Sequence, residues 1–256
     1  MQNESNNRNH LDLWLPAALL FLGLILTKLP GLSILIWLLQ MAVHEVGHAF
    51  IFWLRSIPAI PTFAMAVPLT NSSSILCFVF LLALFGWSFY SARKRGYLIF
   101  QGIVVLVLLS LVLFTWVFSE QFGEMVMIYS GLGGEFFISA IFFVMFFENW
   151  GKSQRTTKLR YFLLGLGAVV YVSALRKWIE IKFASGELPY GALLDFSKLG
   201  GGQSGGDLDR LVRDFGWNEE FIVLSMLMTG VLSGLVMIFS YTVFVFCKLQ
   251  KISSNN

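Results

Sequence analysis

The chain has 256 residues, of which 57% are hydrophobic and 13% are charged, and its mean hydropathy is +0.74. A soluble domain of this length needs far fewer apolar residues, so the composition indicates an integral, multi-pass protein of the cell membrane with the lipid bilayer as its solvent. The formal net charge is only +3, and the basic residues lie in short clusters between apolar runs, so we expect no nucleic acid partner.

About seven apolar runs are long enough to cross the hydrocarbon core, which takes roughly 17 to 25 residues. Each must be helical because lipid offers the backbone no hydrogen-bond partner. The sequence therefore predicts an all-α fold, a polytopic transmembrane helix bundle forming one domain over residues 12–247, between a polar, disordered N-terminal tail (1–11) and a C-terminal tail (248–256). The predicted spans lie near residues 12–28, 32–54, 75–91, 97–118, 125–147, 161–175 and 221–247.

Three segments between the spans differ in composition. Residues 28–31 read Lys-Leu-Pro-Gly and predict a tight turn. Residues 55–74 hold three of the six prolines and predict either a re-entrant or strand-like segment or an ordinary surface loop. Residues 176–220 form the largest polar stretch and include a glycine-rich segment, 200–206, that suits a flexible linker or a gate.

The distribution of Lys and Arg predicts an orientation. Among the short loops, basic residues concentrate at 28–31, 92–96, 148–160 and the C-terminal tail. Cytoplasmic loops carry an excess of Lys and Arg, so with seven spans we expect the N terminus outside and the C terminus in the cytosol. With seven spans, the second span ends on the same side of the membrane as residues 176–220.

The second span contains the sequence His-Glu-Val-Gly-His at residues 44–48. His44 and His48 are four apart, so on a helix they share one face and both imidazoles can reach one ion, while Glu45 points toward water bound to that ion. The chain has three histidines, and two of them fall in this pattern within an apolar run, where ionisable groups are costly unless functional. Gly47 lets a neighbouring helix or a substrate backbone approach closely.

This motif on an early span resembles that of the site-2-protease-like intramembrane zinc metallopeptidases, often written with Gly before the second His, as here. The resemblance implies that His44 and His48 are zinc ligands, that Glu45 is the catalytic general base, and that an aspartate from a later part of the chain is the third ligand. The common later motifs of the family, Asn-Pro-Asp-Gly and Leu-Asp-Gly, are absent from this chain.

A catalytic zinc usually has three protein ligands and one open position, so a third donor is needed. Asp207 follows the glycine-rich segment and precedes the last span, similar to a divergent branch in which Gly or His, then Asp, then an apolar residue comes before a final helix. We expect Asp207 to be this ligand, with Asp209 as the alternative. In a further alternative, Asp207 binds no metal and is only the N-cap of the helix that follows, since Asp is favoured at that position.

Glu135 is another acidic residue inside a span, and intramembrane carboxylates are functional candidates. It either contacts metal or substrate, or it is hydrogen-bonded within the bundle or faces a water-filled cavity. The small residues at 130–134 beside it predict a helix face that packs tightly against the His-bearing span.

The expected function is that of an intramembrane zinc metalloendopeptidase, which hydrolyses peptide bonds in or near transmembrane segments of membrane protein substrates. Zn²⁺ activates water and Glu45 acts as the general base. Two alternatives are a non-catalytic zinc-binding membrane scaffold or regulator, and a small transporter in which the same three side chains relay protons or bind a permeating metal.

Overall fold

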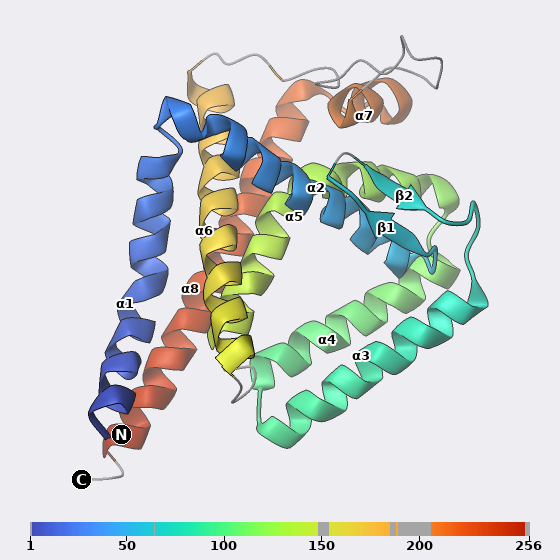
Figure 1. The fold of residues 1–256 in the computed structure, drawn as a ribbon. Helices are drawn as coiled ribbons and strands as arrows, with labels where there is room; N and C mark the ends of the chain where they lie inside the picture. Colours follow the sequence, from blue (N-terminus) through green and yellow to red (C-terminus); the bar gives the residue numbers. More distant parts are fainter. Residues whose placement is uncertain (1, 64, 148–153, 185–187, 189–205, 254–256) are drawn as a thin grey trace.

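The computed structural model describes residues 2–63, 65–147, 154–184, 188 and 206–253. Short strands β1 (Ala59–Pro61) and β2 (Ala66–Pro68) form an antiparallel hairpin, so the segment after the His-bearing helix is strand-like rather than an ordinary loop. The predicted all-α bundle is confirmed (Figure 1). The helices are α1 (Gln2–Leu26), α2 (Ser33–Leu54), α3 (Ile75–Arg95), α4 (Leu98–Val112), α5 (Glu120–Phe147), α6 (Gln154–Phe183), α7 (Asp207–Phe215) and α8 (Glu219–Ser253), with a 3-10 turn at Pro30–Leu32 and a π-helical turn at Leu113–Val117.

Within the described residues, six helices are long and apolar enough to cross a membrane, which makes this an integral multi-pass protein. The first predicted span appears as a shorter apolar helix, Asp12–Leu26. Residues 2–11 are not a disordered tail but the first turns of α1, and residues 176–183 continue α6. These polar segments stay helical because a helix satisfies its own backbone in water as well as in lipid.

Helix α5 is the centre of the bundle and packs against α2, α6 and α8. Its backbone meets that of α2 at two glycines: a Cβ added to Gly134 would lie 2.8 Å from the Cα of Gly47. Ser130 Oγ also donates to the carbonyl oxygen of Gly47, at 3.0 Å. The predicted packing of the small residues at 130–134 against the His-bearing helix is therefore confirmed.

Helix α2 begins and ends toward the same end of the bundle. It starts just after Thr27, whose carbonyl oxygen accepts a hydrogen bond from Arg176 in the last turns of α6. It ends at Arg55, whose guanidinium lies against Gly123 in the first turn of α5, beside α7. Figure 1 shows α2 running obliquely across the bundle between these points.

The start of α1 and the end of α8 lie together at the opposite end. Leu15 and Leu19 belong to the same apolar cluster as Tyr241 and Phe244, and the Asp12 carboxylate pairs with Arg160 at the start of α6, at 2.7 Å. This contradicts the predicted placement of the two ends of the chain on opposite sides, because a run of apolar residues gives the length of a helix but not its tilt. The basic clusters at 93–95 and 158–160 also lie at this end, and an excess of Lys and Arg is typical of cytoplasmic loops.

Helices α3 and α4 form a pair that diverges from the rest of the bundle (Figure 1). They pack mainly against each other, and only 11% of the apolar window of each is buried within the protein. The end of α2 is joined to this pair by Thr115, whose Oγ1 donates to the carbonyl oxygen of Leu54, at 3.0 Å. Most of the surface of α3 and α4 is therefore left for lipid.

We expect the substitution Gly134→Ala to destabilise the bundle by about 1 to 3 kcal/mol, because the new methyl group meets the backbone of α2, which cannot move aside as a side chain can. Thermal unfolding in detergent should then show a midpoint lower by roughly 5 °C. The matched control is Gly165→Ala on α6, where an added Cβ meets nothing within 4 Å. Equal midpoints for the two variants would contradict the close approach of α2 and α5.

Candidate metal centre

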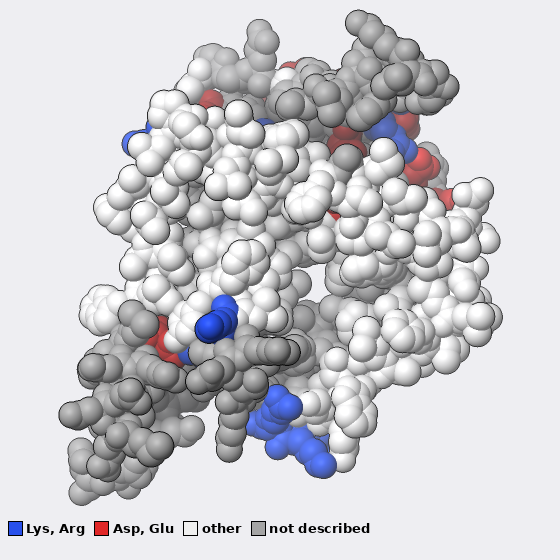
Figure 2. Space-filling view, viewed as in Figure 1, with Lys and Arg blue, Asp and Glu red and all other residues white. Residues whose placement is uncertain are grey.

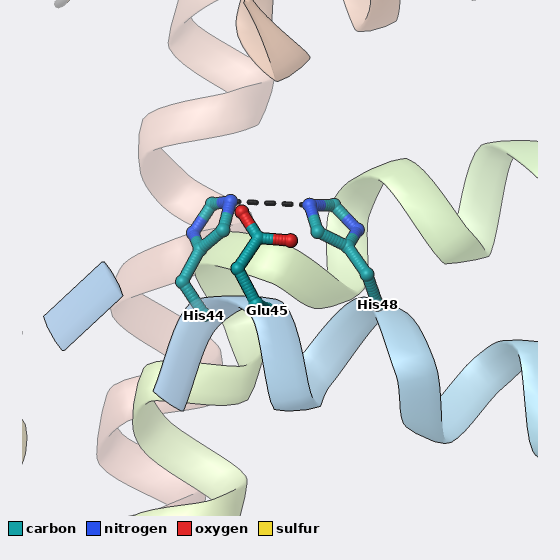
Figure 3. Close-up of side chains that lie close together, drawn as sticks. All are labelled: His44, Glu45 and His48. Carbon is teal, nitrogen blue, oxygen red and sulfur yellow. Dashed lines mark hydrogen bonds between the residues drawn. The ribbon is translucent and has the colours of Figure 1, made fainter. Parts of the chain in front are cut away.

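His44, Glu45 and His48 converge on one side of α2, as the four-residue spacing predicts (Figure 3). All three are buried, with exposed fractions of 9%, 5% and 8%. One possible ligand atom from each lies within 4.8 Å of those of the other two, and the Nε2 atoms of the two histidines are 3.1 Å apart. The group could therefore hold a metal ion.

Asp207, the first residue of α7, places its carboxylate at the same point. Its Oδ2 lies 2.9 Å from Nε2 of His44 and 3.0 Å from Nε2 of His48. Two ring nitrogens and one carboxylate oxygen thus form a nearly equilateral triangle, built from two segments far apart in the sequence.

Asp209 contributes to the N-terminal cap of α7. Its Oδ2 accepts a hydrogen bond from the backbone N–H of Gly206, at 2.9 Å, and Gly206 is the N-cap of α7. A carboxylate three residues after the N-cap satisfies a backbone donor at the helix start. Asp209 therefore helps to cap the helix, while Asp207 faces the histidines. The glycine-rich residues 200–205 and their predicted role as a gate lie outside the described residues.

Two kinds of contact hold α7 over the centre. On its apolar face, Leu208 and Leu211 are buried in a cluster with Trp178 of α6 and Ile222 of α8. On its polar face, Nη2 of Arg210 lies 2.6 Å from Oε1 of Glu124 at the start of α5. The apolar contacts supply the main attachment, and the ion pair ties the helix to α5 close to Asp207.

The other ring nitrogens, Nδ1, face acceptors. Nδ1 of His48 donates to the carbonyl oxygen of Met127, at 2.7 Å. Nδ1 of His44 lies 3.6 Å from Oε1 of Glu135, whose Oε2 accepts a hydrogen bond from Gln40 Nε2, at 3.2 Å. Such partners orient metal-binding imidazoles and place the proton on the ring nitrogen away from the ion. Of the two predicted roles for Glu135, hydrogen bonding within the bundle is the one found.

The triangle of Nε2, Nε2 and Oδ2 suits a cation. With the proton held on Nδ1, both Nε2 atoms carry lone pairs, so three acceptor atoms face one another at 2.9 to 3.1 Å. Donor atoms around a tetrahedral zinc ion stand about 3.3 Å apart for ligand bonds of about 2.0 to 2.1 Å. These side chains therefore fit a small divalent cation, and two imidazoles with a carboxylate are a donor set that zinc accepts.

The centre opens toward α7. The side chain of Asp207 is 19% exposed, against 11% for His44 and 10% for His48. A carboxylate must be ionised to bind a metal ion.

The β-hairpin lies beside Glu45. The backbone of Ala66 in β2 is close enough to the Glu45 carboxylate to interact with it. In β1 the carbonyl oxygen of Ala59 accepts a hydrogen bond from Nε1 of Trp53 on α2, at 2.9 Å. Both strands pack against α2.

Gly131 of α5 leaves room for the two imidazoles. A Cβ added there would contact the His48 ring and lie 2.6 Å from Nε2 of His44. Any side chain at this position would enter the space between the two Nε2 atoms. The sequence pattern marked residues 130–134 as a packing surface but gave no signal for this second role.

Three further contributors were not found from the sequence. Gln40 lies four residues before His44 on the same helical face, and this spacing could have revealed it. The carbonyl oxygen of Met127 is a backbone atom and has no signature in the sequence. The pairing of Glu124 with Arg210 joins residues far apart in the chain, and each one read as an ordinary polar residue.

No family model, curated protein or solved structure matches this chain. The interpretation of the centre depends on its geometry and chemistry.

We expect Gly131→Ala to abolish metal binding with every ligand still present, because the methyl group would occupy the space between the imidazoles. Elemental analysis of the purified variant should show less than about a tenth of the wild-type metal content, because the methyl group would overlap the position of the ion between the two Nε2 atoms. The control is Gly102→Ala on α4, where an added Cβ meets nothing within 4 Å. Wild-type metal content in Gly131→Ala would show that the ion does not lie between these rings.

We expect Arg210→Glu to weaken metal binding severalfold, because it places two carboxylates together and loosens α7 next to Asp207. An exposed ion pair contributes about 0.2 to 1 kcal/mol, which limits the effect to roughly fivefold before repulsion is added. The double variant Glu124→Arg with Arg210→Glu restores opposite charges and should recover most of the affinity. The measurement is competition with a metal chelator, and failure of the double variant to recover would contradict the role of this pair.

Proposed function

We propose that this protein is an intramembrane zinc metallopeptidase of the site-2-protease-like kind. Its substrates would be membrane proteins, cleaved in or near a transmembrane segment. The observation that supports this most is the meeting of Asp207 with His44 and His48, at 2.9 and 3.0 Å, beside a buried glutamate. Three ligands and a neighbouring carboxylate are the minimum set for metal-assisted hydrolysis.

His44, His48 and Asp207 would hold the zinc ion. Glu45 lies on the same side of α2 as the two histidines. When bound, zinc supplies a Lewis acid that polarises a peptide carbonyl and makes a water molecule more acidic. Gln40 and Glu135 hold the His44 ring in place from behind, and the Met127 carbonyl oxygen does the same for His48.

Glu45 would accept a proton from the attacking water and pass it to the leaving amine. Its carboxylate is buried beside the two histidines. A general base must lie within hydrogen-bond reach of the proton that it takes, and the possible ligand atoms of His44, Glu45 and His48 all lie within 4.8 Å of one another.

A transmembrane substrate must be extended where it is cut, because a helix hides its carbonyl groups in hydrogen bonds. The β1–β2 hairpin is an extended element directly beside Glu45, and its exposed side chains include Phe63, Val67 and Leu69. An extended apolar segment could lie against this surface with a carbonyl group near the centre. Asp207, the most exposed of the three ligands, marks the side from which water reaches it.

A single centre favours catalysis over transport. Among the described residues, one group of three or more His, Cys, Asp or Glu side chains converges as a metal site would. A metal or proton transporter is expected to place several polar sites along a path through the membrane. A non-catalytic zinc protein would have no need for Glu45 beside the ligands.

We expect wild-type protein purified in detergent to contain about one zinc ion per chain, and both His44→Ala and Asp207→Ala to lose it, since three protein ligands are needed. Asp209→Ala is the matched control, because it removes a carboxylate from the same turn of α7 that caps the helix rather than facing the histidines. Retention of zinc in Asp207→Ala with loss in Asp209→Ala would reverse the assignment of the third ligand.

We expect Glu45→Gln to keep its zinc and to lose at least about a hundredfold in peptide hydrolysis, the usual contribution of a general base. Cleavage of a library of synthetic transmembrane peptides in detergent can be followed by mass spectrometry. The control is Glu180→Gln, a carboxylate on α6 that is 54% exposed and paired with Arg176. Zinc binding without cleavage by the wild type would favour the non-catalytic alternative, and full activity in Glu45→Gln would exclude Glu45 as the base.

A further inference from the structure

A cavity lies at the turn between α3 and α4, at the end of the bundle away from the metal centre. Its volume is about 200 Å³, and it is lined by Trp87, Ser88, Ser91 and Arg95 from α3 and by Tyr97 and Phe100 beyond the turn. Pockets for drug-sized ligands have roughly 300 to 1,000 Å³, so this one suits a small group. Aromatic rings form one part of the wall, and hydroxyl and guanidinium groups form another.

The turn itself fixes the polar part of this wall. Gly96 ends α3 in the left-handed region, at φ 74°, and its N–H bonds back to the carbonyl oxygen of Arg93. A residue with a side chain would be strained at this φ. The reversal of the chain places Arg95 and Tyr97, on either side of the glycine, at the same cavity.

The cavity carries positive charge with no acidic residue nearby in the sequence. Arg93, Lys94 and Arg95 are exposed, and no Asp or Glu occurs in α3 or α4. Among the described residues, none of the ion pairs involves Arg95. Figure 2 shows the basic group at the end of the α3–α4 pair, and among the described residues on this face no acidic side chain lies beside it.

We propose that this cavity binds the phosphate of an anionic phospholipid. Arg95 would hold the phosphate oxygens with its planar fork of N–H groups, and Ser91 would donate a further hydrogen bond. The acyl chains would run along the exposed apolar surface of the pair, where Trp87 is 70% and Leu84 46% exposed.

Two observations favour a lipid over free phosphate. The cavity lies at the end of two candidate membrane spans, where a Trp side chain suits the boundary between headgroups and hydrocarbon. The basic clusters at this end are typical of cytoplasmic loops, and the cytoplasmic leaflet is the one rich in anionic lipids. The site is separate from the metal centre and does not depend on the proposed proteolysis.

Binding can be tested on the purified, delipidated full chain. Native mass spectrometry gives the affinity for dioctanoyl phosphatidylglycerol and for dioctanoyl phosphatidylcholine. We expect the anionic lipid to bind at least tenfold more tightly. Arg95→Gln, which removes the charge, and Ser91→Leu, which fills the cavity and keeps every charge, should each weaken its binding at least tenfold.

Three controls make the result decisive. Arg95→Lys keeps a charge and should retain part of the affinity, which a misfolded variant would not. Arg93→Gln removes a charge from the same run but not from the cavity wall, and should change the affinity less than threefold. Equal binding of the two lipids, or equal losses in Arg93→Gln and Arg95→Gln, would overturn the proposal in favour of diffuse attraction. Displacement of the anionic lipid by an equal concentration of inorganic phosphate would assign the site to the free anion instead.

Discussion

The contact between the backbones of α2 and α5 sets the positions of the two histidines of the candidate metal centre and of the groups that face their Nδ1 atoms. Because Gly47 and Gly134 keep side chains out of the crossing, the imidazoles of His44 and His48 come to lie directly over α5. Helix α2 contributes residues 40, 44 and 48, and α5 faces them with residues 127, 131 and 135, each row repeating every four positions. A wider separation would leave both Nδ1 atoms without their acceptors.

The charges of the candidate centre would be compensated by a cation. Glu45, Glu135 and Asp207 place three carboxylates around two imidazoles, with exposed fractions of only 5% for Glu45 and 4% for Glu135. Uncompensated charges in a low-dielectric environment cost several kcal/mol each even after relaxation. Protons on the ring nitrogens can compensate part of this negative charge. A divalent cation between the three donor atoms would compensate more of it. A divalent cation at this point would thus serve both the electrostatics of the bundle and the proposed chemistry.

The sequence predicted well what depends on local spacing and poorly what depends on tilt and backbone atoms. The shared face of His44 and His48 follows from helical periodicity alone, and the tight packing of residues 130–134 follows from their small size. The position of Asp207 was reached through a motif and a consistent choice of membrane face, and the structure brings it to the histidines. The predicted placement of the N terminus on the side opposite the C terminus was wrong, because apolar length cannot distinguish a helix that crosses the bundle from one that slants within it, as α2 does.

The long separation of Asp207 from α2 along the chain has a consequence for biosynthesis. A ribosome that adds about 5 to 20 residues per second needs on the order of ten seconds or more to proceed from His48 to Asp207. During that time α3, α4, α5 and α6 enter the membrane while the two histidines lack their third partner. The centre is therefore incomplete while the nascent protein is inserted into the membrane among many other unfolded segments. It is completed only when α7 docks onto the assembled bundle.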